Sequence, residues 1–256
     1  MLPHAASRHV RRLVRNRQDQ AIRIHNSQAS PCRETGHFRK RRRTDRRSIR
    51  RSGTALAFRQ IRKGTFATDE PEYDRLPEWI RPGDWILDVG ANVGHYTKRF
   101  SELVGTEGRV VAFEPTPATF SLLAANVQLF GQPNVTLINA AASDRTSRVA
   151  LSIPKFDSGL VNYYEAHLAT GQEGGLPVLA LAIDSLDFDR RVALVKIDAE
   201  DHEAAVLAGM KNLIEKDHPV LIVETGSKAV VETLSALGYV PEKLPGSPNF
   251  LFKPKA

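Results

Sequence analysis

Residues 85–97 read Trp-Ile-Leu-Asp-Val-Gly-Ala-Asn-Val-Gly-His-Tyr-Thr, an apolar run that ends in an acid and opens into a glycine turn. The run up to Asp88 is typical of a short buried strand, and the apolar spacing over 93–103 indicates a helix after the turn. Gly90 permits a tight turn with close backbone approach, and Gly94 lets the helix pack near the strand. A strand, a glycine turn and a helix in this order predict a parallel α/β unit with a ligand at the turn.

The same alternation continues along the chain after this unit. Short apolar runs are separated by segments with helical spacing, which predicts further βαβ units and a parallel sheet. Strands of a parallel sheet are buried on both faces, and this explains why the runs are continuously apolar. A Pro-Gly-Ser-Pro turn at 245–248 predicts a closing hairpin, and Gly238 lies just past the end of the last helix. The expected strands are 109–114, 135–140, 149–153, 178–183, 192–198, 220–224, 239–244 and 249–252, and the expected helices are 117–130, 201–213 and 227–237.

Charge divides the chain into two parts. Residues 1–52 contain 16 Lys and Arg against three Asp and Glu, a net charge of +13, whereas residues 53–256 carry a net charge of −6. The basic segment cannot bury enough apolar surface to offset its ordering entropy, so we expect a disordered tail followed by one folded domain over 53–256. Three interpretations of the tail stay open: a solvated extension, an arm that binds nucleic acid, or residues that precede the true start.

Composition excludes several classes of protein. No apolar run approaches the roughly 20 residues that a membrane-spanning helix needs. A single cysteine, Cys32, excludes an internal disulfide framework and any cysteine-rich zinc site within one chain. Low cysteine usage favours a reducing compartment, and we therefore expect a cytoplasmic protein.

Acids at two strand ends indicate the class of ligand. Asp88 lies immediately before the glycine turn, where it would repel a pyrophosphate, and the central glycine of G-x-G-x-x-G is absent. Both features disfavour a nicotinamide-dependent reductase, and the carboxylate suits a cationic amino group or a sulfonium. Glu114 ends the next strand and can accept hydrogen bonds from both hydroxyls of a ribose. A cation joined to a ribose points to S-adenosylmethionine as cofactor, with Asp144 lying where the adenine would be.

Five blocks of the sequence follow one another in a characteristic order. They are DVGANVGHYT (88–97), FEPTP (113–117), NVTLINAAASD (134–144), VKIDAEDHEAAVLAG (195–209) and LIVETG (221–226). Together they resemble the FkbM family of S-adenosylmethionine-dependent methyltransferases, over about Gly64 to Phe252. The resemblance implies an α/β class I methyltransferase fold. This is a Rossmann-like three-layer sandwich with a mostly parallel seven-stranded sheet and a C-terminal antiparallel hairpin.

The resemblance also assigns roles to residues. By position in the family's blocks, Asp88, Gly90, Asn92 and Gly94 match the cofactor loop, Glu114 the ribose-binding acid, Asp144 the adenine-side acid, and Asp198 with Glu200 the acidic pair after the fourth strand. The chain departs from the family at Asp201, because the family commonly has Glu-Gly where this sequence has Glu-Asp. If that position adopts a positive φ, Asp201 is strained there.

The candidates for catalysis lie at one strand end. A hydroxyl is a poor nucleophile while it keeps its proton, so methyl transfer benefits from a general base. Asp198, Glu200 and His202 follow a predicted strand at its carboxyl end, the edge where open α/β sheets bind ligands, and we predict that they are catalytic. Lys196 lies two residues before Asp198 on the same side of the strand and can pair with a carboxylate. The acids from Asp198 to Asp201 do not have the spacing of a recognised metal signature, so no metal site is expected.

These observations lead to one main hypothesis for function. It is an S-adenosylmethionine-dependent O-methyltransferase that acts on a hydroxyl of a saccharide or secondary metabolite, the acceptor that the resemblance implies. Two alternatives are an RNA methyltransferase that uses the basic tail of residues 1–52 and a non-catalytic scaffold that only binds the cofactor.

Overall fold

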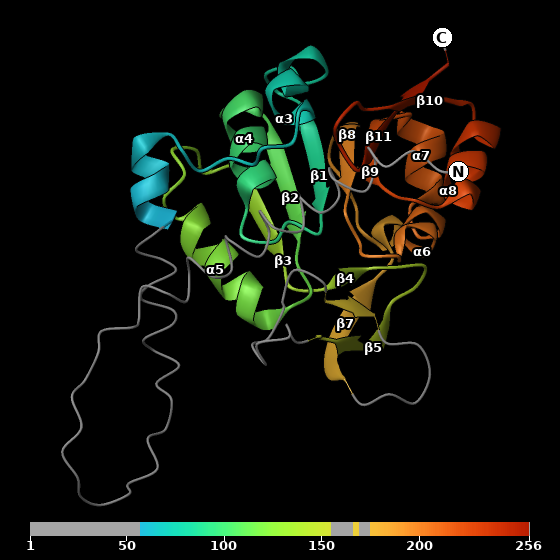
Figure 1. Cartoon of the computed structure of the whole chain (residues 1–256), viewed down its shortest axis with the longest axis horizontal. Coiled ribbons are helices and arrows are strands. Elements are labelled where there is room, and N and C mark those ends of the chain that lie inside the picture. Colours follow the sequence, from blue (N-terminus) through green and yellow to red (C-terminus); the bar gives the residue numbers. More distant parts are fainter. Residues whose placement is uncertain (1–56, 155–165, 169–174, 256) are drawn as a thin grey trace, which may run out of the picture. The chain divides into compact units, whose positions relative to one another are not determined.

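The computed structural model describes residues 57–154, 166–168 and 175–255 (Figure 1). The chain divides into two compact units, Met1–Thr65 and Phe66–Ala256. In the first unit, residues 57–63 form a helix, and the N–H of Thr65 donates to the carbonyl of Gln60 (2.9 Å). The predicted tail over 1–52 and its boundary with the domain lie outside the described residues and remain predictions.

The second unit is built on a seven-stranded sheet with the order β10-β11-β9-β8-β1-β2-β3. The pairs from β9 through β8, β1 and β2 to β3 are parallel, whereas β11 is antiparallel to both β9 and β10. The mostly parallel sheet and the closing antiparallel hairpin are therefore confirmed. The strands are β1 Trp85–Val89, β2 Arg109–Phe113, β3 Val135–Ile138, β8 Val192–Ile197, β9 Val220–Glu224, β10 Tyr239–Lys243 and β11 Asn249–Pro254.

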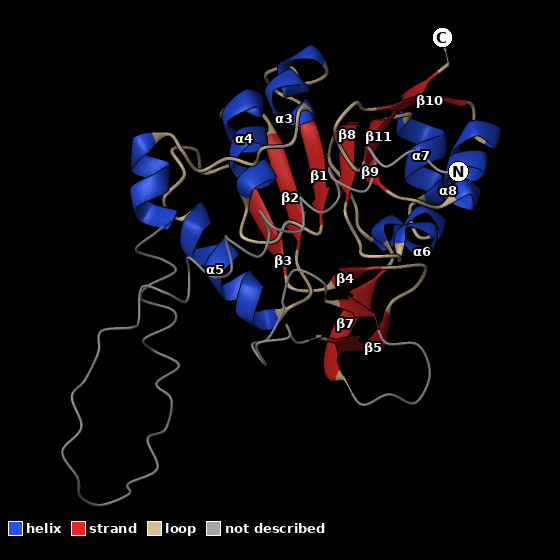
Figure 2. Cartoon of the chain, viewed as in Figure 1, coloured by secondary structure: helices blue, strands red, loops and turns tan. Residues whose placement is uncertain are grey.

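Helices cover both faces of this sheet (Figure 2). On one face lie α3 Glu72–Arg75, the 3-10 helix η1 Leu76–Glu78, α4 His95–Val104 and α5 Pro117–Val127. On the other face lie α6 Glu203–Ala208, α7 Lys211–Asp217 and α8 Lys228–Ala236. The three layers match the expected sandwich, although α5 ends three residues before the predicted 117–130 segment does.

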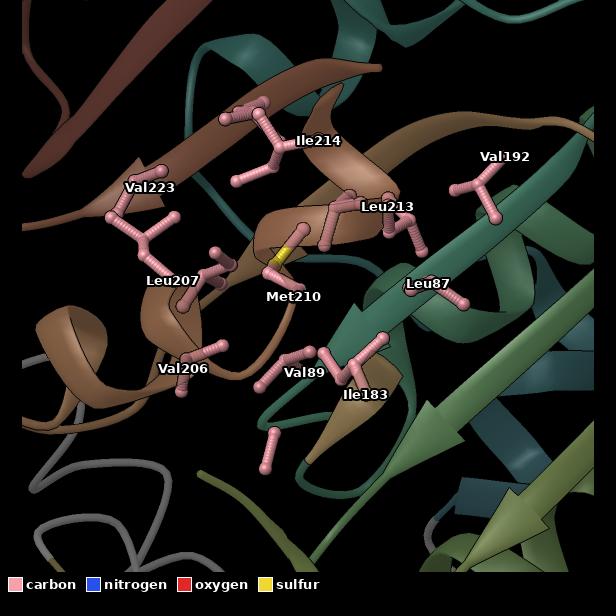
Figure 3. Packing of buried hydrophobic residues seen from close by; sticks show 14 of the residues in the cluster. Leu87, Val89, Ile183, Val192, Val206, Leu207, Met210, Leu213, Ile214 and Val223 are labelled. Atoms are coloured by element: carbon pink, nitrogen blue, oxygen red, sulfur yellow. The ribbon is translucent and has the colours of Figure 1, made fainter. Parts of the chain in front are cut away.

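Alternation along the central strands decides which residues reach each layer. Leu87 and Val89 of β1 pack against α6 and α7 in a large apolar cluster (Figure 3). Ile86 lies in the cluster on the opposite face, with residues of α3 and α4. The continuous apolar run of β1 is thus divided between two buried faces, as a central parallel strand requires.

A second, smaller sheet is formed by strands that lie between β3 and β8 in the sequence and do not pair with the main sheet. It has the order β4-β7-β5-β6, and β5 is antiparallel to both β7 and β6. The sequence predicts strands at 149–153 and 178–183 but does not indicate that they pair with each other. The strands of this small sheet are β4 Ala141–Ala142, β5 Ser147–Ser152, β6 His167–Leu168 and β7 Leu176–Leu181.

The predicted single helix over 201–213 is wrong, because the segment forms two helices, α6 and α7, that are separated at Gly209. A Cβ on Gly209 would lie 1.8 Å from the carbonyl oxygen of Ser143, so this position allows only glycine. A new helix then starts against Asp184, which precedes β8 in the chain. The Asp184 carboxylate accepts hydrogen bonds from the N–H groups of Asn212 (2.9 Å) and Leu213 (3.0 Å). The helical spacing of apolar residues continues from α6 into α7, so the local sequence does not indicate the break between them.

The first prediction concerns this distant cap. Asp184→Ala removes the acceptor for two backbone N–H groups at the start of α7 and should lower the free energy of unfolding by about 1–2 kcal/mol. Urea unfolding followed by circular dichroism measures the loss. Asp187→Ala, which removes the same charge from a nearby exposed position, should change it by less than about 0.5 kcal/mol. Equal losses in the two variants would contradict a capping role for Asp184.

Candidate functional site

The turn between β1 and α4 brings three loops together. Gly90 (φ +79°) and Gly94 (φ +97°) adopt the left-handed conformations that favour glycine, and Asn92 also has a positive φ of 50°. The N–H of Gly90 donates to the carbonyl of Phe113 at the end of β2 (3.0 Å). A Cβ on Gly90 would lie 1.9 Å from the carbonyl oxygen of Asp198, just past β8. Glycine at this position therefore sets how closely the turn approaches the loop after β8.

Glu114 connects this turn to the loop after β2. One of its carboxylate oxygens accepts the N–H of Asn92 (3.0 Å) and the other accepts the N–H of Thr116 (2.8 Å). The residue is only 5% exposed, and this burial raises the pKa of Glu114 to about 7, although both hydrogen bonds oppose the rise. The carboxyl group therefore changes charge close to neutral pH.

A cavity runs along the carboxyl edge of β8, β1 and β2, bounded on one side by the small sheet. Its wall includes six of the nine predicted site residues: Gly90, Asn92, Glu114, Asp198, Glu200 and His202. Asp88, Gly94 and Asp144 do not line it. The wall also contains residues to which the sequence analysis gave no individual role, namely Phe113, Pro115, Thr116, Ala140, Ala141, Leu151, His167 and Leu168.

Asp88 lies in the layer beneath the turn. It is 0% exposed, and its Oδ2 accepts a hydrogen bond from the hydroxyl of Thr97 in α4 (2.6 Å). Its Oδ1 has no hydrogen-bond partner among the described residues. In the register of β1 with β8, Asp88 is paired with Lys196, so both side chains project to the face covered by α4.

The carboxyl end of β8 carries a buried ion pair. Lys196 is 2% exposed, and its Nζ lies 3.2 Å from Oδ2 of Asp198 and 4.7 Å from the ring centroid of Tyr96. The predicted pairing of Lys196 with a carboxylate is confirmed. Burial alone would lower the pKa of Lys196, but nearby carboxylates, Asp198 and Glu70 foremost, outweigh it and raise that pKa. The ammonium is therefore charged at neutral pH.

A network of polar side chains surrounds this pair on the α4 face. The hydroxyl of Tyr96 donates to Glu70 (2.5 Å), and Glu72 accepts hydrogen bonds from Ser247 (2.8 Å) and Asn249. Burial raises the pKa of Glu70, partly opposed by Lys196 and by the Tyr96 hydroxyl. The sequence analysis missed Glu70, Glu72 and Asn249, because they come from opposite ends of the domain and no local pattern joins them.

His202 lines the cavity and contacts the loop after β4. Its Nε2 is 2.9 Å from the hydroxyl of Ser143, and that hydroxyl also contacts Oδ1 of Asp144 (3.1 Å). Burial lowers the pKa of His202, and Asp144 partly opposes the shift. The structure therefore brings His202 and Asp144 together near the small sheet, while Asp198 pairs with Lys196.

The turn after Asp198 is strained in the way the departure from the family predicts. Glu200 and Asp201 have φ values of 46° and 70°, both in the left-handed region. Among non-glycine residues, Asp and Asn tolerate this region best. Asp201 thus occupies a conformation for which glycine is the least strained residue.

The described part of the chain contains neither a cluster of metal-ligating side chains nor a membrane-spanning helix. No group of three or more His, Cys, Asp or Glu residues there is arranged to hold a metal ion. No helix in the same part of the chain is long and apolar enough to cross a membrane.

The sequence is similar to a family of methyltransferases and to individual methyltransferases. Residues 88–241 match the family model described as the methyltransferase FkbM domain. The hexuronic acid methyltransferase AglP of Haloferax volcanii is 26% identical over 159 residues, covering 57% of this chain and 58% of that protein. The 31-O-demethyl-FK506 methyltransferase FkbM of Streptomyces tacrolimicus is 31% identical over 166 residues, covering 52% of this chain and 62% of that protein. The match thus spans about 60% of the length of each of these relatives.

A solved structure is also similar. The methyltransferase FkbM from Methylobacillus flagellatus KT aligns with a TM-score of 0.48 and 16% sequence identity, over 78% of this chain and 59% of that one.

The second prediction isolates the close approach at the glycine turn. Gly90→Ala combines a positive φ with a collision at the Asp198 carbonyl, whereas Gly238→Ala has a positive φ and nothing within 4 Å of the new Cβ. We expect Gly238→Ala to lower the free energy of unfolding by about 1–2 kcal/mol. Gly90→Ala should cost about 2 kcal/mol more because the turn must move away. Urea unfolding of both variants measures the difference, and equal losses would show that the carbonyl does not constrain the turn.

Proposed function

This chain belongs to the FkbM family of methyltransferases, and from that membership we propose that it transfers a methyl group from S-adenosylmethionine to a hydroxyl of a saccharide or a secondary metabolite. The two relatives support the choice of acceptor, since one is named for a hexuronic acid and the other for an O-demethylated natural product. One observation carries the proposal: three of the predicted residues line the same cavity. They are Glu114, the acid expected to bind a ribose, Gly90 of the glycine turn, and Asp198, which pairs with the buried Lys196.

The residues at the cavity fit the proposed cofactor. Gly90 lets the turn lie directly against the backbone of Asp198 at the cavity wall, and the buried Glu114 carboxylate can accept hydrogen bonds from the two ribose hydroxyls. Ala140, Ala141 and Ala142 leave room along the wall for a flat ring. Beneath the turn, Oδ1 of Asp88 has no hydrogen-bond partner among the described residues, and we assign it as an acceptor for the amino group of the cofactor.

When bound, S-adenosylmethionine supplies an electrophilic methyl group on a positively charged sulfur. Asp198 is the residue we assign to the acceptor hydroxyl. Asp198 would accept the proton that this hydroxyl loses when the cofactor supplies its methyl group to the hydroxyl oxygen. His202 and Glu200 line the same cavity, and the contact of His202 with Ser143 favours a role in shaping the adenine side with Asp144. Asn92 and Gly94 hold the turn in its left-handed path.

The third prediction is a pH dependence of cofactor binding. With a raised pKa of about 7, Glu114 loses its charge as the pH falls through neutrality, and with it the ability of both oxygens to accept ribose hydroxyls. Affinity for S-adenosylhomocysteine, the demethylated cofactor, should therefore be highest above pH 7.5. It should fall about tenfold per pH unit below pH 6.5. Calorimetric titration between pH 5.5 and 8.5 measures the profile.

Two variants control this experiment. Glu114→Gln should bind at least about tenfold more weakly at pH 8 and show a flat profile, because its amide does not titrate in this range. Glu107→Gln changes an exposed glutamate and should leave the profile unchanged. A pH dependence that survives in Glu114→Gln would assign the effect to another group.

The fourth prediction tests the reaction itself. The full chain is incubated with radiolabelled S-adenosylmethionine and a panel of hexoses, hexuronic acids, hydroxylated natural products and RNA. We expect label in an acid-stable methyl ether of a hydroxyl compound. Asp198→Asn should lower kcat by about 10²–10⁴-fold with little change in cofactor affinity, whereas the exposed Asp189→Asn should be neutral. Label in RNA alone, or cofactor binding without any turnover, would refute the proposed acceptor class.

A further inference from the structure

We propose that Lys196 is a positioning residue for methyl transfer, whose buried ammonium fixes the orientation of the Asp198 carboxylate at the cavity wall. The role given to Asp198 rests on the proposed function. Lys196 does not line the cavity and so acts only through its neighbours.

The first argument is the burial of an ammonium group in the centre of the sheet. Lys196 lies in β8 between Val195 and Ile197, and all three residues are buried. An ammonium in such a place is stable only when charged and polar neighbours replace the water that it has lost. A residue needed only for packing would be apolar here, as its neighbours in the strand are.

The second argument is the contact with Asp198. The backbone of Asp198 is fixed, because its N–H donates to the carbonyl of Val89 (3.0 Å) and continues the pairing of β8 with β1. The remaining freedom lies in its side chain, which is 23% exposed and reaches the cavity. Lys196 Nζ contacts Oδ2 of this carboxylate at 3.2 Å and so restricts its rotation. Alternation along a strand places residues two apart on one face, which makes this pair a consequence of the backbone.

The third argument is that Lys196 is itself held in place. Its Nζ lies 4.7 Å from the ring centroid of Tyr96, a distance suited to a cation–π interaction, and the hydroxyl of Tyr96 is bonded to Glu70. Asp88 is its register partner on β1 and is bonded to Thr97 of α4. The charged groups that act on Lys196 or Asp198 come from two strands, the loop after β2, one helix and the segment before α3: Asp88, Glu224, Glu114, Glu203 and Glu70.

Together these contacts hold in place the carboxylate that we propose as the general base. A catalytic group works best when neighbouring residues lock its side chain in the productive orientation. Without the ammonium, the Asp198 carboxylate loses the contact that restricts its rotation. Loss of Lys196 should therefore slow the chemical step more than it weakens binding.

The test compares Lys196→Met, Asp198→Asn and the double variant in the full chain, using an acceptor that the parent protein methylates. Lys196→Met should lower kcat about 30-fold or more and change the affinity for S-adenosylhomocysteine less than threefold. In the Asp198→Asn background, Lys196→Met should cost less than a further threefold. Lys228→Met, an exposed lysine at the start of α8, is the matched control.

The opposite results are equally clear. A kcat within threefold of the parent, or the same loss in both backgrounds, would overturn the proposal, because Lys196 would then not act through Asp198. Lys196→Arg keeps the charge and should retain at least a tenth of the parent kcat. A folded Lys196→Arg protein that is as slow as Lys196→Met would also overturn it.

Two further measurements keep the test independent of folding and of the proposed function. Should Lys196→Met fail to fold by near-ultraviolet circular dichroism, Lys196→Gln carries the same expectations with a donor group retained. Carbon-13 spectra of aspartate-labelled protein, assigned with Asp198→Asn, should show the Asp198 carboxyl resonance shifted in Lys196→Met or Lys196→Gln and not in Lys228→Met. An unshifted resonance refutes the contact. A parent protein that transfers no methyl group to any hydroxyl refutes the proposed function and leaves the spectral test of the contact in place.

Discussion

The absence of a side chain at Gly90 is the constraint on which the site depends. Because nothing projects from this Cα, the turn after β1 lies directly against the backbone carbonyl of Asp198. That approach brings the ends of β1 and β8 together, and Glu114 then ties the same turn to the end of β2 through the N–H of Asn92. Three loops from three neighbouring strands are thereby fixed around one cavity, and a larger residue at position 90 would separate them.

Local patterns were enough to predict the parallel sheet and the glycine turn and strand-end acids that meet at the cavity. Glycines and acids at strand ends lie within a few residues of each other, so their geometry follows from the strand, the turn and the helix that contain them. The side-by-side placement of Lys196 and Asp198 was predictable for the same reason, since it needs only the two-residue period of a strand. Asp88 shows the limit of this reasoning. Asp88 lies near the end of its strand, as the sequence predicts, but the face to which its side chain projects depends on the whole sheet.

Features that depend on long-range contact were not predictable. Asn249 and Glu70 are 179 residues apart, and His202 and Ser143 are 59 apart, yet each pair is in hydrogen-bond contact. The break between α6 and α7 has the same origin, because Gly209 packs against the carbonyl of Ser143 in another part of the chain. The apolar periodicity of a sequence predicts which face of a helix or strand is buried, but it does not predict which segment of the chain covers that face. The small sheet, whose strands supply one wall of the cavity, belongs to this class as well.

The order of strands in the main sheet has a consequence for the chain during its synthesis. β11 follows β10 in the sequence but lies between β9 and β10 in the sheet, so β9 acquires its neighbour on that side only when Asn249–Pro254 has emerged. At roughly 5–20 residues per second, the stretch between β9 and β11 takes a few seconds to translate. Throughout that interval a sheet formed from the preceding strands ends in β9, a run of Val-Leu-Ile-Val with one open edge. Such an edge is a template for pairing with other nascent chains. Because β11 is synthesised last, the open edge of β9 leaves the chain prone to co-translational aggregation until the hairpin of β10 and β11 pairs with it.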